Sequence, residues 1–158
     1  MRKTYRLHRT QWVSRPLAEV FAFFSNARNL ESITPPWLRF EILPGVPDPL
    51  TRGAAIRYRL HWHGLPIHWT TQIARWEPPH EFEDLQVTGP YSLWRHVHQF
   101  AEEGVGTRLS DTVNYALPFG WIGQLAHALA VRRNIEQIFD FRQTRIREMF
   151  GSPAGERP

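Results

Sequence analysis

The stretch that says most about the fold is residues 64–100, GLPIHWTTQIARWEPPHEFEDLQVTGPYSLWRHVHQF. Three alternating apolar segments are separated there by two proline-containing turns, a pattern typical of three consecutive strands. Strand side chains alternate between the two faces of a sheet. In the third segment this places four rings on one face, and these belong to Trp94, His96, His98 and Phe100. A face that combines aromatic rings with two histidines suits the wall of a pocket for an apolar molecule with a polar end.

The same alternation on either side of this stretch predicts seven strands in total. They are expected at residues 5–13, 37–43, 56–62, 67–73, 82–87, 94–100 and 109–117. From the second strand on, most connections are short turns, so the sheet should be antiparallel. The last two strands are expected to meet at a two-residue turn formed by Glu103 and Gly104.

Two short helices are predicted directly after the first strand. The first has Ser14 as its N-cap and Pro16 in its first turn, where the missing proline N–H costs nothing. The second covers residues 27–33, with Asn26 as its N-cap. It ends at the proline pair that follows, because the residue before a proline avoids helical backbone.

A long amphipathic helix is predicted at residues 121–150. Its apolar stripe, at helical spacing, is formed by Trp121, Leu125, Ala128, Leu129, Ile135, Phe139, Ile146 and Phe150. A sheet with an aromatic face and a helix with an apolar stripe bury these surfaces against each other. We therefore expect an α+β fold in which a curved, seven-stranded antiparallel sheet wraps around the C-terminal helix. Such curvature leaves space between sheet and helix, and the small Ala128 should leave part of it unfilled.

Length and composition set limits on the organisation of the protein. With 158 residues, 42% of them hydrophobic, the chain can form one domain with a core. We expect this domain at residues 1–150 and a disordered tail at residues 151–158. No apolar run approaches the ~18 residues that span a bilayer, and the N-terminus lacks the pattern of a signal peptide. The chain has no cysteine, which excludes disulfides, cysteine nucleophiles and thiolate metal sites and favours a cytoplasmic location.

The net charge of +4 raises the question of a nucleic-acid partner. The positive charge is nearly all arginine and is scattered along the chain, and its one dense cluster, on the C-terminal helix, alternates with acidic residues. A solvated helix face explains this arrangement as well as a phosphate-binding patch does, so nucleic-acid binding is not expected. An interaction module, in which this helix contacts an acidic partner, RNA or a membrane, stays open as an alternative.

Four segments carry a family resemblance: NLESITPPWLRF, GLPIHWTTQIARWEPPHEFEDLQ, GPYSLWRHVHQF and GTRLSDTVNYALPFG. With the order of elements, they resemble the START-like, or SRPBCC, superfamily of helix-grip proteins, and more narrowly its bacterial polyketide cyclase/dehydrase-like and coenzyme Q-binding-like members. The resemblance covers residues 5–150. It implies a deep apolar cavity between the sheet and the C-terminal helix. It does not imply one activity, because members include lipid carriers, cyclases and hydrolases.

The residues themselves suggest a polar site on the inner surface. A turn at Glu103-Gly104 places His96 opposite Asp111, which is the one carboxylate on an otherwise apolar strand face. A buried carboxylate is costly unless it is paired, and it can fix the tautomer and raise the pKa of a neighbouring imidazole. Three roles stay open for this pair: a structural hydrogen bond, contact with a ligand, and acid–base catalysis. In the catalytic case His96 or His98 is the general base and Asp111 orients it.

The full set of candidate ligand-binding residues combines the inner strand face with the helix stripe. It consists of Tyr58, Trp69, Thr71, Asp84, Gln86, Trp94, His96, His98, Phe100, Asp111, Tyr115, Ala128, Arg132 and Phe139. For Arg132, which lies within the apolar stripe, three arrangements are open. Its side chain extends to solvent, pairs with Asp84 or Asp111, or waits for a ligand carboxylate.

No metal site and no cofactor is expected. His96, His98 and Asp111 are residue types that bind metals, but no established metal motif accompanies them. The chain also lacks the glycine-rich dinucleotide motif, the Walker loop and the GxSxG nucleophile elbow.

We therefore expect a protein that binds a hydrophobic small molecule, lipid-like or polyketide-like, in an internal cavity, with transport of that molecule as an extension of this role. Binding is favoured over catalysis because no catalytic signature transfers residue by residue. A cyclase, dehydratase or hydrolase that uses the His96–Asp111 pair is the first alternative, and the interaction module is the second. Neither the oligomeric state nor the identity of the ligand follows from the sequence.

Overall fold

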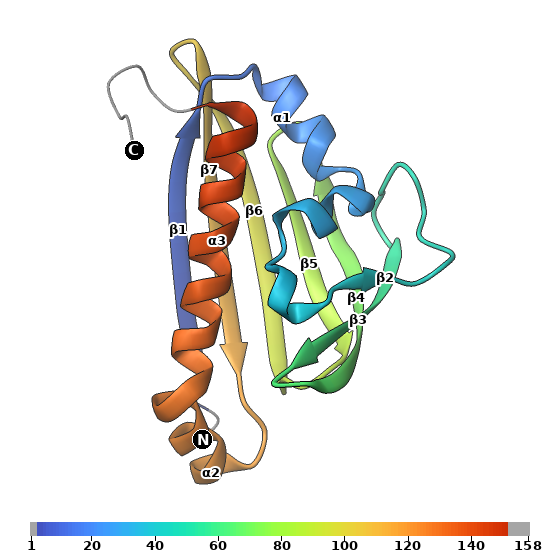
Figure 1. Ribbon diagram of the computed structural model, residues 1–158. Coiled ribbons are helices and arrows are strands. Elements are labelled where there is room, and N and C mark those ends of the chain that lie inside the picture. Colours follow the sequence, from blue (N-terminus) through green and yellow to red (C-terminus); the bar gives the residue numbers. More distant parts are fainter. Residues whose placement is uncertain (1–2, 152–158) are drawn as a thin grey trace.

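The computed structural model describes residues 3–151, and its main feature is a seven-stranded antiparallel sheet (Figure 1). The strands are β1 (Tyr5–Val13), β2 (Glu41–Ile42), β3 (Ala55–Trp62), β4 (Leu65–Glu77), β5 (Glu81–Thr88), β6 (Leu93–Glu103) and β7 (Gly106–Ala116). Their order in the sheet is β1-β7-β6-β5-β4-β3-β2, so β1 pairs with the last strand. The expected α+β helix-grip architecture is confirmed. Of the tail expected at residues 151–158, residues 152–158 lie outside the described residues.

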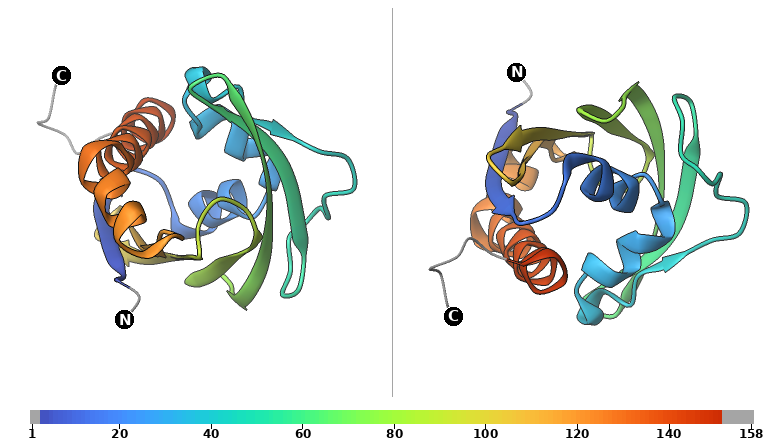
Figure 2. Two further views of the ribbon diagram at one scale, coloured as in Figure 1. Left: turned by 90° about the horizontal axis from the view of Figure 1, so that it is seen from below. Right: turned by 90° about the horizontal axis from the view of Figure 1, so that it is seen from above.

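Helices lie across the concave face of this sheet. They are α1 (Leu17–Phe24), the 3-10 helices η1 (Ala27–Ile33) and η2 (Pro36–Leu38), and the C-terminal run α2 (Gly120–Ala126), η3 (His127–Val131) and α3 (Arg132–Phe150). Seen along the strands, the sheet curves around an interior that α3, α1 and η1 border (Figure 2). Bulges between β4 and β5 interrupt the regular pairing, and bulges increase the local twist that such curvature needs. None of the described helices is long and apolar enough to cross a membrane.

Two expectations for the first half of the chain are corrected. The strand expected at residues 37–43 is reduced to the two residues of β2, because η2 occupies Pro36–Leu38 and is followed by Arg39 in left-handed backbone. Ser14 is not a helix cap: α1 starts three residues later, out of reach of its side chain, which donates to the Phe150 carbonyl instead. The cap at Asn26 is confirmed, since its side chain accepts a hydrogen bond from the Arg28 N–H.

The C-terminal helix contains a π-helical turn, η3, that the apolar pattern did not predict. One extra residue in a turn rotates everything on its N-terminal side by about 100° relative to a continuous α-helix. The buried positions before α3 are therefore Gly123 and His127. The first half of the predicted stripe is wrong for the same reason, and the residues that face solvent are Trp121, Leu125, Ala128 and Leu129.

The hairpin between β6 and β7 turns one residue later than expected. Glu103 pairs with Gly106, so the two-residue loop is Gly104-Val105, and every pairing moves by two positions. A shift of two keeps each side chain on its predicted face. It places His98 opposite Asp111, where His96 was expected.

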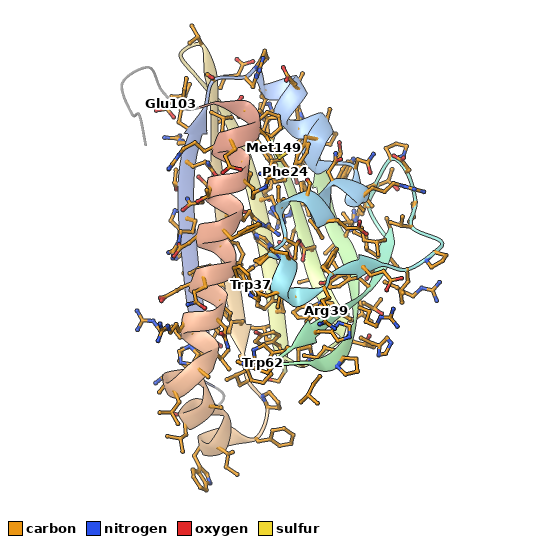
Figure 3. All side chains as sticks on the ribbon, in the orientation of Figure 1. Phe24, Trp37, Arg39, Trp62, Glu103 and Met149 are labelled. Carbon is orange, nitrogen blue, oxygen red and sulfur yellow. The ribbon has the colours of Figure 1, made fainter. Side chains whose placement is uncertain are left out.

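The core is divided into two apolar clusters at opposite ends of β6. One lies under α1 and the last turns of α3, and it includes Phe24 and Phe100, with Met149 packed against it. The other surrounds Tyr115 and Phe139. Figure 3 shows Phe24 and Met149 together at the α1 end, and Trp62 near the opposite end of the sheet. The interior between the clusters holds the polar side chains of β6.

Replacing Gly106 by alanine should destabilise the fold. A Cβ atom there would lie 2.2 Å from the Val13 carbonyl oxygen and 2.4 Å from the Trp12 ring, where β7 begins beside β1. Because backbone cannot move aside as a flexible side chain does, we expect a loss of about 3 kcal/mol in the free energy of unfolding, measured by urea denaturation. The control is Gly104→Ala in the same hairpin, where a Cβ atom meets nothing within 4 Å and the positive φ alone should cost about 1 kcal/mol. Equal losses for the two variants would contradict this packing.

Candidate functional site

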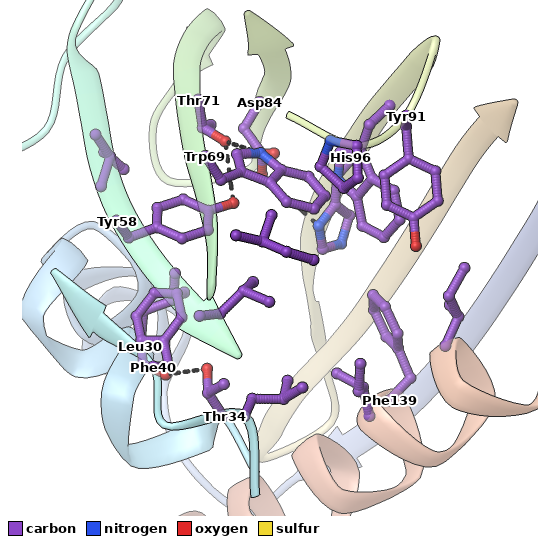
Figure 4. A pocket seen from close by; sticks show the side chains of 18 of the residues that line it. Leu30, Thr34, Phe40, Tyr58, Trp69, Thr71, Asp84, Tyr91, His96 and Phe139 are labelled. Carbon is purple, nitrogen blue, oxygen red and sulfur yellow. Dashed lines mark hydrogen bonds and ion pairs between the residues drawn. The ribbon is translucent and has the colours of Figure 1, made fainter. Parts of the chain in front are cut away.

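A pocket of about 390 Å³ lies between the concave face of β3 to β6 and the helices η1 and α3 (Figure 4). Aromatic rings border it on several sides: Tyr58 and Trp69 from adjacent strands, Tyr91 from the turn before β6, and Phe139 from α3. The strand rings point inward through alternation, Phe139 follows the buried side of its helix, and Tyr91 projects from the turn. The pocket wall is therefore mainly apolar.

Some polar atoms of the wall satisfy one another. Thr71 Oγ1 accepts a hydrogen bond from Trp69 Nε1 at 3.1 Å and lies 3.3 Å from the Tyr58 hydroxyl. Burial raises the pKa of Tyr58, so its hydroxyl stays protonated. This group of side chains offers a ligand hydroxyl oxygens without any charge.

The main polar feature is a cluster of four side chains from three neighbouring strands, Asp84 on β5, His96 and His98 on β6, and Asp111 on β7. His96 Nε2 donates to Asp111 Oδ1 at 2.9 Å, and His98 Nε2 donates to Asp84 Oδ2 at 2.9 Å. The imidazole centroids are 3.7 Å apart, and both rings are buried. His98 Nδ1 lies 2.9 Å from Asp111 Oδ1 but makes no hydrogen bond there. Each histidine thus faces both carboxylates.

The two histidines differ in their protonation. Burial lowers the pKa of His96, and the neighbouring His98 lowers it further; together these two effects outweigh the two carboxylates, which raise it. Burial also opposes the charged form of His98, but Asp111 and Asp84 outweigh it and raise the pKa. Burial disfavours both carboxylate anions, yet the histidines overcome this and lower the pKa of Asp84 and, more strongly, of Asp111. The cluster therefore pairs two carboxylates with one readily charged and one readily neutral imidazole.

Three members of the cluster could also hold a metal ion. Asp84, His96 and His98 each offer one ligand atom, and these atoms lie within 4.8 Å of one another. Two imidazoles and a carboxylate form a ligand set that divalent transition metals accept. The same atoms are engaged with one another or with Asp111, so a metal would have to displace those hydrogen bonds.

Eight of the candidate ligand-binding residues line the pocket: Tyr58, Trp69, Thr71, Asp84, Trp94, His96, His98 and Phe139. Four others are inside the molecule but not on this wall. Phe100 packs in the core against Phe24, and the Tyr115 hydroxyl lies 2.8 Å from His127 Nε2. Gln86 forms two hydrogen bonds with the backbone of Tyr91. Asp111 lies behind the pocket wall and contacts His96, which lines the pocket.

Ala128 and Arg132 do not line the pocket. The placement expected for Ala128 is wrong, because the π-helical turn rotates this part of the helix away from the sheet and leaves the residue exposed. Arg132 is the first residue of α3, and its side chain takes the solvent-exposed arrangement, one of the three left open. Arg132 Nε pairs with Glu136 on the same helix at 3.0 Å rather than with Asp84 or Asp111.

The arginine that does line the pocket is Arg142, which the sequence analysis missed. Its position could have been found from spacing, because it continues the buried stripe of α3 that Ile135 and Phe139 begin and Ile146 extends. A charged residue on such a stripe breaks the apolar pattern, and that break is the signal.

Replacing Asp111 by asparagine tests the cluster. We expect the pKa of His98 to fall, and the free energy of unfolding to fall by about 1–3 kcal/mol, since a buried charge-assisted hydrogen bond is altered. A raised histidine pKa stabilises the fold fully below the unfolded value of about 6.5, and this contribution is lost as pH rises through the folded value. The loss caused by Asp111→Asn should therefore be larger at about pH 6 than at about pH 9.

Histidine proton resonances followed against pH, with urea denaturation at the two pH values, measure these effects. The exposed carboxylate of Asp140, which pairs with Arg9 at the surface, provides the control variant Asp140→Asn. An unchanged His98 titration in Asp111→Asn would show that the two groups are not coupled.

Known proteins share both sequence features and the fold of this chain. Residues 13–141 match the family model described as polyketide cyclase / dehydrase and lipid transport. No curated protein sequence matches the chain significantly.

Solved structures with this fold come from bacteria and plants. A Chromobacterium violaceum protein has a TM-score of 0.69 at 15% identity, over 94% of this chain and 96% of its own. Ginseng major latex-like protein 151, from Panax ginseng, has a TM-score of 0.68 at 10% identity, over 93% and 97%. A norcoclaurine synthase point mutant from Thalictrum, in complex with a transition state analogue, has a TM-score of 0.66 at 11% identity, over 94% and 98%. At such identities the likeness concerns the fold, whereas the family match covers most of the sequence. The chain belongs to the family of polyketide cyclases/dehydrases and lipid transport proteins.

Proposed function

We propose that the protein binds a hydrophobic small molecule, lipid-like or polyketide-like, in the pocket between the sheet and α3. The observation that carries this proposal is a cavity of about 390 Å³ whose wall is mainly apolar and aromatic, with one polar cluster on it. Each 100 Å² of apolar ligand surface removed from water would contribute about 2.5 kcal/mol to binding. The polar cluster would orient the polar end of the ligand.

We also propose that the protein transports this molecule, because one edge of the pocket is open and apolar. Phe119 and Ile122, at the start of α2, both line the pocket and are more than half exposed. Trp121 and Leu129 expose neighbouring apolar surface on the same part of the helix. We expect a ligand to pass at this edge, where an apolar rim would permit transient contact with a membrane surface. A cytoplasmic location is part of the same proposal, supported by the absence of cysteine.

A second candidate function is catalysis on such a ligand, of the cyclase, dehydratase or hydrolase type. The observation that favours it is His96, a pocket-wall imidazole that burial keeps neutral and that Asp111 orients by a hydrogen bond. A neutral, oriented imidazole is the form that acts as a general base. The test is mass spectrometry of bound compounds after incubation with the protein, since a conversion changes their mass. His96→Gln should stop the conversion while the compounds still bind. If the unmodified protein returns every compound unchanged, catalysis is contradicted and binding is the only function supported.

Filling the pocket should weaken binding. Val131 lines the pocket and is partly buried, so a phenylalanine there would extend into the cavity. We expect Val131→Phe to weaken the binding of the neutral fluorescent probe N-phenyl-1-naphthylamine by about tenfold, since overpacking costs about 1–3 kcal/mol. Fluorescence titration measures the affinity, and thermal melts should show a much smaller change because the phenylalanine enters open space.

The matched control is Ala128→Phe, one turn earlier on the same helix but exposed and outside the pocket. It should alter neither the affinity nor the melting temperature. A probe that does not bind the unmodified protein, or that binds Val131→Phe with unchanged affinity, would count against this pocket as the binding site.

A further inference from the structure

Arg142 is a buried cation on the pocket wall. It lies on α3 among the buried side chains Phe139 and Ile146, and only 9% of its surface is exposed. Among the described residues that line the pocket, it is the only arginine or lysine, and Asp84 is the only carboxylate. With His98, whose pKa is raised, these two residues determine where charge is presented to a ligand.

The guanidinium of Arg142 has few partners within the protein. Its Cζ atom lies 5.2 Å from the centre of the Phe139 ring, a cation–π contact. Its Nε and Nη1 atoms are buried and have no hydrogen-bond partner among residues 3–151. Within the same residues no carboxylate forms an ion pair with it. Donors of a buried guanidinium are thus left unused by the fold.

Other arginines of α3 show that this arrangement is particular to the pocket. Arg132 pairs with Glu136, and Arg145 pairs with Glu148, although both arginines are exposed to water. A buried cation needs a partner more than an exposed one does, because burial removes its hydration. Asp84 acts on Arg142 only at a distance and forms no ion pair with it, since Asp84 Oδ2 accepts the hydrogen bond of His98.

We propose, building on the proposed function, that Arg142 binds the carboxylate of a hydrophobic monocarboxylic acid held in the pocket. The planar guanidinium presents its N–H donors in a fork that matches the two oxygens of a carboxylate. The apolar part of the acid lies against the aromatic wall formed by Tyr58, Trp69 and neighbouring rings. Repulsion by Asp84 keeps the acid group away from the histidine cluster, so the ligand has one favoured orientation.

The experiment compares an acid with its uncharged ester. Dodecanoate and methyl dodecanoate share the same chain, and each displaces N-phenyl-1-naphthylamine from the pocket in competition titrations. The proteins compared are the unmodified chain, Arg142→Met, Arg142→Lys and the control Arg133→Met, which removes an exposed arginine from the same helix. Chelator in the buffer removes metal ions that would compete for the carboxylate.

We expect the unmodified protein and Arg133→Met to bind dodecanoate at least about tenfold more tightly than the ester, the size of a charge-assisted hydrogen bond. Arg142→Met should lose this preference while its affinity for the ester and for the probe is kept, and Arg142→Lys should keep part of it. Thermal melts should show that Arg142→Met is as stable as the unmodified chain, since a buried cation without a partner is replaced by an apolar side chain.

Two results would overturn the assignment while leaving the proposed function in place. One is equal affinity of the unmodified protein for the acid and the ester, and the other is an acid preference that survives in Arg142→Met. A purely structural role for Arg142 would lower stability and weaken acid, ester and probe alike. Failure of the unmodified protein to bind the probe or either dodecyl compound would instead contradict the proposed function itself.

Discussion

A carboxylate buried inside a sheet requires a partner for its charge, and this requirement organises the centre of the molecule. Asp84 and Asp111 stand on the strands that flank β6, and His96 and His98 of β6 lie between them. The cluster links three strands through side chains in addition to the backbone hydrogen bonds of the sheet. A pairing shifted by one residue would turn these groups to the outer face, so the paired charges and the register support each other.

The same cluster explains why the interior is not filled by a continuous apolar core. Apolar side chains gather at the two ends of β6, around Phe100 and around Tyr115, and the polar middle is left facing α3 across the pocket. Unlike charges line this space, but they do not neutralise each other directly: Asp84 is held by His98, and Arg142 contacts the Phe139 ring. A mainly apolar cavity with separated charges favours amphipathic molecules in one orientation.

The relation to other proteins concerns the scaffold more than the site. Structures that share 10–15% identity with this chain superpose with TM-scores of 0.66–0.69. Alternation of apolar and polar residues, rather than particular side chains, specifies such a sheet and its helix, so the fold persists where the residues differ. The family description covers both catalysis and transport, and the chemistry of this pocket has to be argued from its own residues.

Apart from β2, the amino-acid sequence by itself determined the strands, their faces and the presence of a long C-terminal helix, because period-two and period-3.6 patterns are local properties of the chain. It brought His96, His98 and Asp111 to one inner surface even though the turn was placed one residue too early, since a shift of two keeps the faces. Only the tertiary structure decided the helix phase. The π-helical turn carries no local signal in the apolar pattern, and it moved Ala128 out of the pocket. The tertiary structure also showed that Arg142 is the buried cation of the pocket, because the absence of a partner depends on what packs around a side chain in three dimensions.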